Sequence, residues 1–117
     1  IFALLQRCYA NDPTVITPEE AVRCATRAGA LSQGREDCGE ISEGFRADLV
    51  LFDMDTPWCT PQHDPLGNLL WSASGTDVML TMADGRVVYR QGEWPTLDVA
   101  RARYEVERIK ESILAKL

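Results

Sequence analysis

The chain has 117 residues, of which 45% are hydrophobic and 26% charged, the composition of an ordinary globular protein and not of a disordered one. A folded chain of this mass exposes roughly 6,400 Å² of surface, which leaves enough burial for one small domain. The formal net charge of −6 opposes attraction to a nucleic-acid backbone or an anionic membrane. No apolar stretch approaches the roughly 20 residues of a membrane span. We therefore expect a soluble cytoplasmic protein without nucleic-acid or membrane partners.

Four cysteines, Cys8, Cys24, Cys38 and Cys59, occur without a Cys-x-x-Cys pair. In a chain with no secretory leader pattern, this usage favours reduced thiols over a disulfide framework.

Two helices are expected near the amino terminus. Residues 1–9 place Phe2, Leu5 and Cys8 at helical spacing, and no capping residue precedes Phe2, so we expect the chain to enter in the middle of an amphipathic helix of a longer protein. Thr17-Pro18-Glu19-Glu20 is a capping box that starts a second helix. The apolar side of that helix is made of the small residues Ala21, Ala25 and Ala28, which predicts close approach of a neighbouring element.

The rest of the chain alternates between strand and helix patterns. Residues 47–52 form a short run that is apolar on both faces, which predicts a central strand. Residues 55–68 contain three prolines and read as a loop, with a short helix over 66–71. Residues 78–90 alternate around Asp84-Gly85 and predict a β-hairpin. Asp98 caps a final helix whose apolar stripe is Val99, Ala102, Val106, Ile109, Ile113 and Leu117.

The single histidine, His63, limits the chemistry that the chain can carry, because triads and histidine-rich metal sites need several such groups. Cys59, His63 and Asp64 offer sulfur, nitrogen and oxygen, but no second ligand pair recurs, so the pattern favours a loop histidine bonded to the backbone over a zinc site.

Two further groups of residues have a functional and a structural interpretation. Asp48, Asp53 and Asp55 border the predicted strand, where carboxylates more often accept bonds from turn N–H groups than form a catalytic dyad. The three tryptophans lie in or beside loops, where packing over the sheet is favoured over a binding surface: Trp58, Trp71 and Trp94.

Several stretches resemble the metal-dependent amidohydrolases. Residues 39–53, Gly-Glu-Ile-Ser-Glu-Gly-Phe-Arg-Ala-Asp-Leu-Val-Leu-Phe-Asp, resemble the carboxy-terminal signature of that family, apart from Cys38 before it, where an aliphatic residue is more usual. Residues 84–92 resemble its hairpin, and 17–30 its last barrel-side helix. His63-Asp64-Pro65, Asn68-Leu69 and residues 72–75 narrow the likeness to the aminohydrolase branch of guanine, cytosine and adenosine-type deaminases and triazine hydrolases.

The resemblance implies the end of a (β/α)8 barrel beside a composite β-sandwich. The family's zinc site uses a His-x-His pair, two further histidines, a glutamate and an aspartate, and none of these has a counterpart here. The resemblance therefore assigns no catalytic, cofactor-binding or metal-binding residue to this chain. It implies an α+β fragment: residues 1–36 from the helical end of the barrel, 37–97 from the sandwich and 98–117 as a carboxy-terminal helix.

The function expected from this resemblance is the carboxy-terminal part of an amidohydrolase that hydrolyses a non-peptide C–N bond, as a deaminase of a nitrogen heterocycle that uses zinc or another divalent metal. The fragment alone would be inactive. Its partners would be the preceding barrel portion, a small heterocyclic substrate bound by the parent protein, and a second copy in a homo-oligomer. The alternative is an independent, non-catalytic α+β interaction module that binds through the loop of Trp58, His63 and Trp71.

Overall fold

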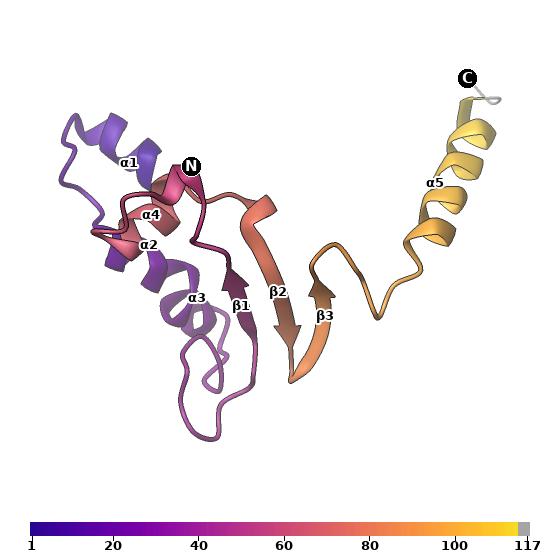
Figure 1. Ribbon diagram of the computed structural model, residues 1–117, viewed down its shortest axis with the longest axis horizontal. Helices are drawn as coiled ribbons and strands as arrows, with labels where there is room; N and C mark the ends of the chain where they lie inside the picture. Colours follow the sequence, from indigo (N-terminus) through magenta and orange to yellow (C-terminus); the bar gives the residue numbers. More distant parts are fainter. Residues whose placement is uncertain (115–117) are drawn as a thin grey trace.

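The structure is a computed structural model that describes residues 1–114, apart from the side chain of Glu111. Four helices lie on one side of a small sheet, and a fifth helix projects beyond the other side (Figure 1). The elements are α1 (Phe2–Ala10), α2 (Pro18–Ala25), α3 (Arg27–Ser32), β1 (Leu49–Phe52), the 3-10 turn η1 (Pro57–Cys59), α4 (Pro65–Trp71), η2 (Gly75–Asp77), β2 (Val78–Ala83), β3 (Arg86–Arg90) and α5 (Val99–Leu114). This is the small α+β arrangement expected from the sequence.

Helix α1 forms where the sequence predicts it but buries a different face. Ala3 is buried, whereas Phe2 and Leu5 are 52% and 60% exposed. The inward side is fixed by Arg7, one turn after Ala3, whose guanidinium donates to the backbone carbonyls of Val15 and Ile16 at 2.9 Å each. The apolar stripe predicted for this helix therefore faces outward.

The predicted capping box is present at the start of α2. Thr17 N–H donates to the Glu20 carboxylate at 2.8 Å, and Glu20 N–H donates to Thr17 Oγ1 at 3.3 Å. The helix ends sooner than its pattern suggests, because Thr26 has φ −119° and ψ −102° and separates α2 from α3. Ala21 is buried and α2 packs against α4, whereas Ala25 stays exposed.

The three strands form an antiparallel sheet in the order β1-β2-β3. Residues 84–85 connect β2 and β3, and Asp84 and Gly85 both have positive φ, at 50° and 76°, so the predicted hairpin is confirmed. The prediction that residues 47–52 form a central strand is wrong within the described residues: β1 is an edge strand, and Val50 and Leu51 are 53% and 56% exposed. Leu49 is exposed as well, and only Phe52 of this strand is half-buried by residues 1–114.

Helix α5 begins where the sequence places it. Asp98 Oδ1 accepts the backbone N–H of Arg101 at 2.9 Å, which confirms the predicted cap. The helix stands apart from the sheet in Figure 1, and its apolar stripe is exposed from Val106 to Ile113. Leu117, the last member of the predicted stripe, lies outside the described residues.

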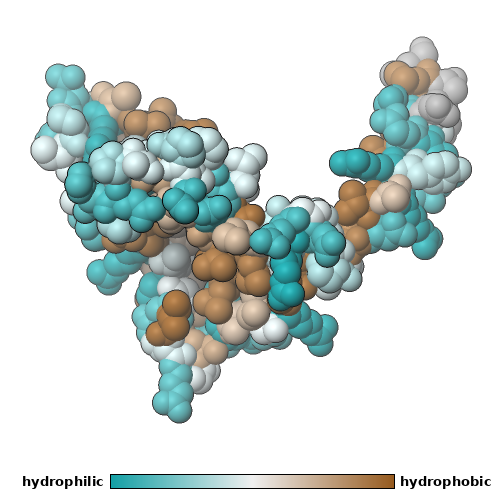
Figure 2. Space-filling view, in the orientation of Figure 1, coloured by the Kyte–Doolittle hydropathy of each residue, from teal (hydrophilic) through white to brown (hydrophobic). Residues whose placement is uncertain are grey.

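Burial is thin for a chain of this size. The buried hydrophobic side chains of residues 1–114 are all small: Ala3, Ala21, Cys38 and Cys59. The surface is 9,208 Å², against the roughly 6,400 Å² of a compact chain of this mass, and the Cα radius of gyration is 18.6 Å, against about 13 Å. Figure 2 shows hydrophobic side chains gathered at the surface over the sheet and along one side of α5. The expectation of a self-contained core is therefore wrong.

None of the helices within residues 1–114 combines the length and the apolar character that crossing a bilayer requires.

Candidate functional site

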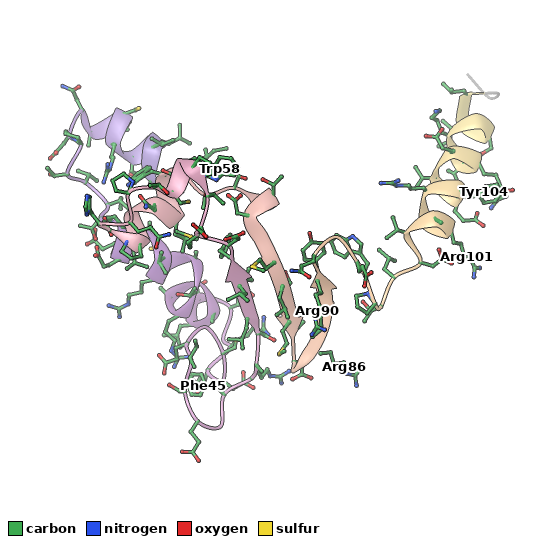
Figure 3. All side chains as sticks on the ribbon, in the orientation of Figure 1. Phe45, Trp58, Arg86, Arg90, Arg101 and Tyr104 are labelled. Carbon is green, nitrogen blue, oxygen red and sulfur yellow. The ribbon has the colours of Figure 1, made fainter. Side chains whose placement is uncertain are left out.

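The best-defined polar group in the described residues surrounds Asp77, which is 5% exposed. Its Oδ2 accepts the Ser74 backbone N–H at 2.8 Å and the Trp58 indole N–H at 3.1 Å. The bond from the Ser74 N–H, assisted by the Trp58 N–H, holds the pKa of Asp77 below its ordinary value although burial acts in the opposite direction. Trp58 belongs to η1, and its side chain is labelled near α4 in Figure 3. The carboxylate is therefore an ionised anchor between η1 and η2, with both bonds made to Oδ2.

An open depression of about 440 Å³ lies beside this anchor. Its lining comes from three segments that the sheet brings together, namely Asp53, Thr56, Trp58, Thr76, Asp77, Val78, Met79, Tyr89 and Gln91. Thr56 Oγ1 is buried here and has no hydrogen-bond partner among the described residues. The depression thus has the unsatisfied Thr56 hydroxyl and two carboxylates, Asp53 and Asp77, each of which already accepts a backbone N–H. No group of three or more possible metal ligands forms there among the described residues.

The three residues considered as metal ligands are used separately. Cys59 is fully buried and its carbonyl accepts the Asn68 amide at 2.7 Å. Asp64 caps α4 through a bond from the Gly67 N–H to Oδ1 at 3.0 Å. His63 is exposed on the loop between them. No group of three or more His, Cys, Asp or Glu side chains suited to a metal ion forms within residues 1–114, so the residues present do not fit the family's zinc site.

Two of the three aspartates that border β1 accept bonds from turn N–H groups. Asp48 Oδ1 accepts the backbone N–H of Asp84 in the hairpin turn at 2.7 Å, and its Oδ2 accepts from Arg35 at 3.2 Å. Asp53 Oδ1 accepts the backbone N–H of Asp55 at 2.9 Å. The prediction of turn acceptors is confirmed for Asp48 and Asp53, and the structure brings no two of these carboxylates into hydrogen-bonding contact.

An exposed ion-pair group lies near the same turn. Arg46 Nε donates to Asp37 Oδ2 at 2.6 Å, and Arg46 Nη1 lies 3.7 Å from Asp84 Oδ1. The hydrogen bond from Arg46 lowers the pKa of Asp37, and the same bond raises the pKa of Arg46. This group links the loop after α3 to the hairpin.

The tryptophans are packed by three different partners. The guanidinium of Arg7 lies 4.4 Å from the ring centroid of Trp71, which ties α1 to α4. Trp94 lies against Tyr89 of β3 with ring centroids 4.9 Å apart, as packing over the sheet predicts. Because Trp58 is bound to Asp77, each of the three rings has a structural partner, and the sequence-based alternative of a binding surface gains no support from them.

Sequence reasoning missed two arginines that hold the helical part together. Arg7 reaches both the 15–16 segment and Trp71, and Arg27 Nη1 donates to the carbonyls of Glu36 and Cys38 at 2.9 and 3.0 Å. The Arg27 guanidinium also lies 5.0 Å from the centroid of the Phe45 ring. The sequence signal was an arginine on a helix face that otherwise carries small residues. A guanidinium in such a place needs acceptors for its N–H groups, and backbone carbonyls can supply them.

The comparisons with known proteins assign the class. A model of the Amidohydrolase family matches residues 1–88, which is most of the chain, and the chain therefore belongs to the amidohydrolase family. Two curated relatives, both named 5-methylthioadenosine/S-adenosylhomocysteine deaminase, illustrate its place. The protein from Dictyoglomus thermophilum is 34% identical over 99% of this chain and 27% of its own length, and the protein from Moorella thermoacetica is 36% identical over 91% and 25%.

Solved structures agree with this assignment. An adenosine deaminase from Xanthomonas campestris with bound zinc matches 97% of this chain and 26% of its own, with a TM-score of 0.89 and 29% identity. A zinc complex of atrazine chlorohydrolase from Arthrobacter aurescens TC1 matches 79% of this chain and 20% of its own, with a TM-score of 0.71 and 26% identity. The resemblance to the aminohydrolase branch is confirmed, and the chain spans about a quarter of the length of the curated relatives it matches.

Proposed function

We infer that this chain is the carboxy-terminal part of a hydrolytic deaminase that acts on an adenine-type nucleoside, and that its own role is to support the catalytic part. The relatives named above are deaminases of adenine nucleosides and related compounds, and the Xanthomonas campestris protein is an adenosine deaminase. Each is about four times as long as this chain. The substrate and the reaction therefore belong to the whole protein.

The observation that carries the supporting role is the uncovered apolar surface of α1 and β1. Phe2 and Leu5 on α1, and Val50 and Leu51 on β1, are all more than half exposed. Surface of this kind is normally buried against another element of the same protein. In our proposal, residues 1–36 pack against the barrel, 37–97 contribute one part of a composite β-sandwich, and 98–117 form a separate helix.

The metal belongs to the absent part of the protein in this proposal. The relatives in the solved structures hold zinc, whereas the possible ligands in residues 1–114 are spread over a buried thiol, a helix cap and turn acceptors. We therefore assign the zinc ligands and the groups that move protons to other residues of the same protein. Asp48, Asp53 and Asp77 then act by holding turns and 3-10 segments in place.

The test compares ammonia release by the whole protein and by the 117-residue chain, both supplied with zinc. The substrates are adenosine, 5′-methylthioadenosine and S-adenosylhomocysteine. Atrazine is the comparison for the triazine hydrolases, and its hydrolysis is followed by chloride release, because a chlorohydrolase breaks the C–Cl bond and releases no ammonia. We expect turnover of at least one nucleoside by the whole protein and none by the chain alone. Turnover by the isolated chain, or a whole protein that acts on none of the nucleosides, would overturn the proposal.

A further inference from the structure

The depression beside Asp77 contains acceptor atoms that residues 1–114 leave without a partner. Asp77 is 5% exposed, and every hydrogen bond that the described residues make to its carboxylate goes to Oδ2, so Oδ1 receives none from them. Thr56 Oγ1 is buried in the lining of the same depression and has no partner among these residues either. Polar groups buried to this extent are normally paired, because an unpaired one costs free energy. The two atoms together indicate a hydrogen-bond donor that comes from outside residues 1–114.

The depression is also acidic. Its lining contains the carboxylates of Asp53 and Asp77, and none of the lining residues in the described part of the chain is basic. The two residues are neighbours, because the Asp53 N–H donates to the Asp77 backbone carbonyl at 2.7 Å. The bond from the Ser74 N–H lowers the pKa of Asp77, which keeps that carboxylate charged at neutral pH. A donor that carries positive charge therefore suits the depression better than a neutral one.

Two aromatic residues complete the lining and narrow the kind of cation. Trp58 is held by its bond to Asp77, and the Tyr89 ring is held against Trp94 with centroids 4.9 Å apart. A guanidinium group is planar, stacks on aromatic rings and presents several N–H donors in a fixed fork. An ammonium group is a compact point charge that stays strongly hydrated. Carboxylate oxygens, a hydroxyl and aromatic rings in one depression thus favour an arginine side chain over a lysine.

We propose that the depression receives the guanidinium group of an arginine from the absent part of the same protein. Its N–H groups donate to Asp77 Oδ1 and Thr56 Oγ1, and its charge is balanced by Asp53 as well as Asp77. The absent part is the source because the curated relatives are about four times as long as this chain. Asp53 also directly follows β1, the exposed edge strand that we have assigned to the contact with that part. The inference rests on the supporting role in the proposed function and gives that contact a defined chemistry.

Asp53 and Thr56 supply variants with matched controls. Asp53→Asn removes a charge from the lining but retains Oδ1, which accepts the Asp55 N–H of the turn. Asp55→Asn changes the net charge equally at an exposed residue that does not line the depression. Thr56→Val removes the buried hydroxyl with little change of shape, whereas Thr56→Ser retains it. None of these changes touches the bonds that Asp77 makes to Ser74 and Trp58.

The first experiment treats the whole protein with phenylglyoxal, which modifies accessible guanidinium groups, and identifies the modified arginines by peptide mass spectrometry. We expect one arginine outside residues 1–117 to react slowly in the native protein. Its modification should become roughly tenfold faster in Asp53→Asn and several-fold faster in Thr56→Val, because each change weakens a charge-assisted contact. Asp55→Asn and Thr56→Ser should leave the rate within about twofold.

The second experiment measures thermal unfolding of the whole protein. Thr56→Val should lower the melting temperature by a few degrees, since the guanidinium loses an acceptor that valine cannot replace. A hydroxyl that stayed unpaired in the whole protein would give the opposite sign, because valine would then remove an unsatisfied polar group. The sign of the shift therefore tests whether the Thr56 hydroxyl has a partner.

Several outcomes would overturn the proposal. One is that no arginine outside residues 1–117 becomes more reactive in Asp53→Asn and Thr56→Val, and another is that Thr56→Val raises the melting temperature. A lower melting temperature without any responsive arginine would mean that water, a lysine or a separate ligand satisfies the hydroxyl, which also contradicts it.

Ammonia release by the same preparation separates this inference from the proposed function. A whole protein that deaminates a nucleoside but has no responsive arginine would overturn the arginine contact alone. A responsive arginine in a protein that deaminates none of the nucleosides would support the contact and overturn the proposed reaction.

Discussion

At the scale of single residues, Gly39 shows how closely the loop after α3 crosses the junction of α2 and α3. Its φ is +87°, and a Cβ built there would lie 2.8 Å from Arg27 Cα and 2.8 Å from the Thr26 carbonyl oxygen. These are backbone atoms that cannot rotate away. The glycine in this part of the family signature is therefore required for two separate reasons, conformation and space.

Gly39→Ala should destabilise the whole protein by about 2–4 kcal/mol, from a disfavoured φ together with a backbone clash. Gly34→Ala is the matched control, because Gly34 has a φ of +73° but nothing within 4 Å of a built Cβ. It should cost only about 1 kcal/mol. Urea unfolding measures both, and equal losses in the two variants would show that the close approach to the α2–α3 junction is absent.

Asp77 provides a prediction about pH. Its pKa is lowered from 3.8, chiefly by the Ser74 N–H, so its contribution to stability is present above that pH and is lost as the pH falls through the lowered value. Asp77→Asn removes the charge, and its amide N–H group can face the Ser74 or Trp58 N–H group that now donates to the carboxylate. The variant should melt a few degrees lower than the native protein at pH 7.

The difference in melting temperature caused by Asp77→Asn should shrink as the pH is lowered below about 3.8, the ordinary value for the group. Asp55→Asn is the control, because Asp55 is exposed at the neighbouring turn. Thermal unfolding followed from pH 7 to pH 3 measures both. A difference that is constant over this range would mean that the carboxylate charge contributes nothing to the anchor.

At the scale of elements, β1 carries the most informative mismatch between its sequence and its surroundings. Leu51 pairs with Leu80 of β2 in the backbone ladder, yet its side chain is 56% exposed. If the composite sandwich forms, Leu51→Ser in the whole protein should cost about 1–3 kcal/mol, the usual loss for a buried leucine. Arg86→Ser, at the exposed end of the hairpin, should stay within about 0.5 kcal/mol.

Chemical denaturation of the two whole-protein variants decides this point. An equal, small effect of Leu51→Ser and Arg86→Ser would mean that β1 stays uncovered in the complete protein. A selective loss at Leu51 would support its burial beneath another strand or helix.

Local signals in the sequence predicted most elements, because these signals act within a few residues. The Thr17 box, the Asp84-Gly85 turn and the Asp98 cap each involve bonds between near neighbours, and all three are present. The break at Thr26 was missed, because it accompanies a contact with Gly39 that lies further along the chain.

The burial of each face was harder to predict, and so was the use of the candidate site residues. Periodicity identifies an apolar face on α1 and on β1 but not the partner that covers it, and here no partner lies within the described residues. The turn roles of Asp48 and Asp53 followed from their positions at the strand ends. The anchor at Asp77 did not, because the indole of Trp58 reaches it from 19 residues away.

At the scale of the whole molecule, the surface exceeds that of a compact chain by nearly half. The 117 residues are shaped as an extended piece, with helices on one side of a narrow sheet and α5 beyond the other side (Figure 1). This shape fits a family member of which the chain spans about a quarter. Its stability is accordingly a property to be measured in the complete protein.

The bond between Asp48 and the turn at Asp84 has a consequence for how the sheet is aligned. It joins residues that are 36 positions apart, and it fixes where β1 begins relative to the end of β2. A slip of one residue would turn every side chain of β1 to the opposite face, and a strand that is apolar on both faces has no pattern of its own to resist this. The aspartate of the Ala-Asp signature thus selects one alignment among several that the leucines and valine of β1 would accept equally well.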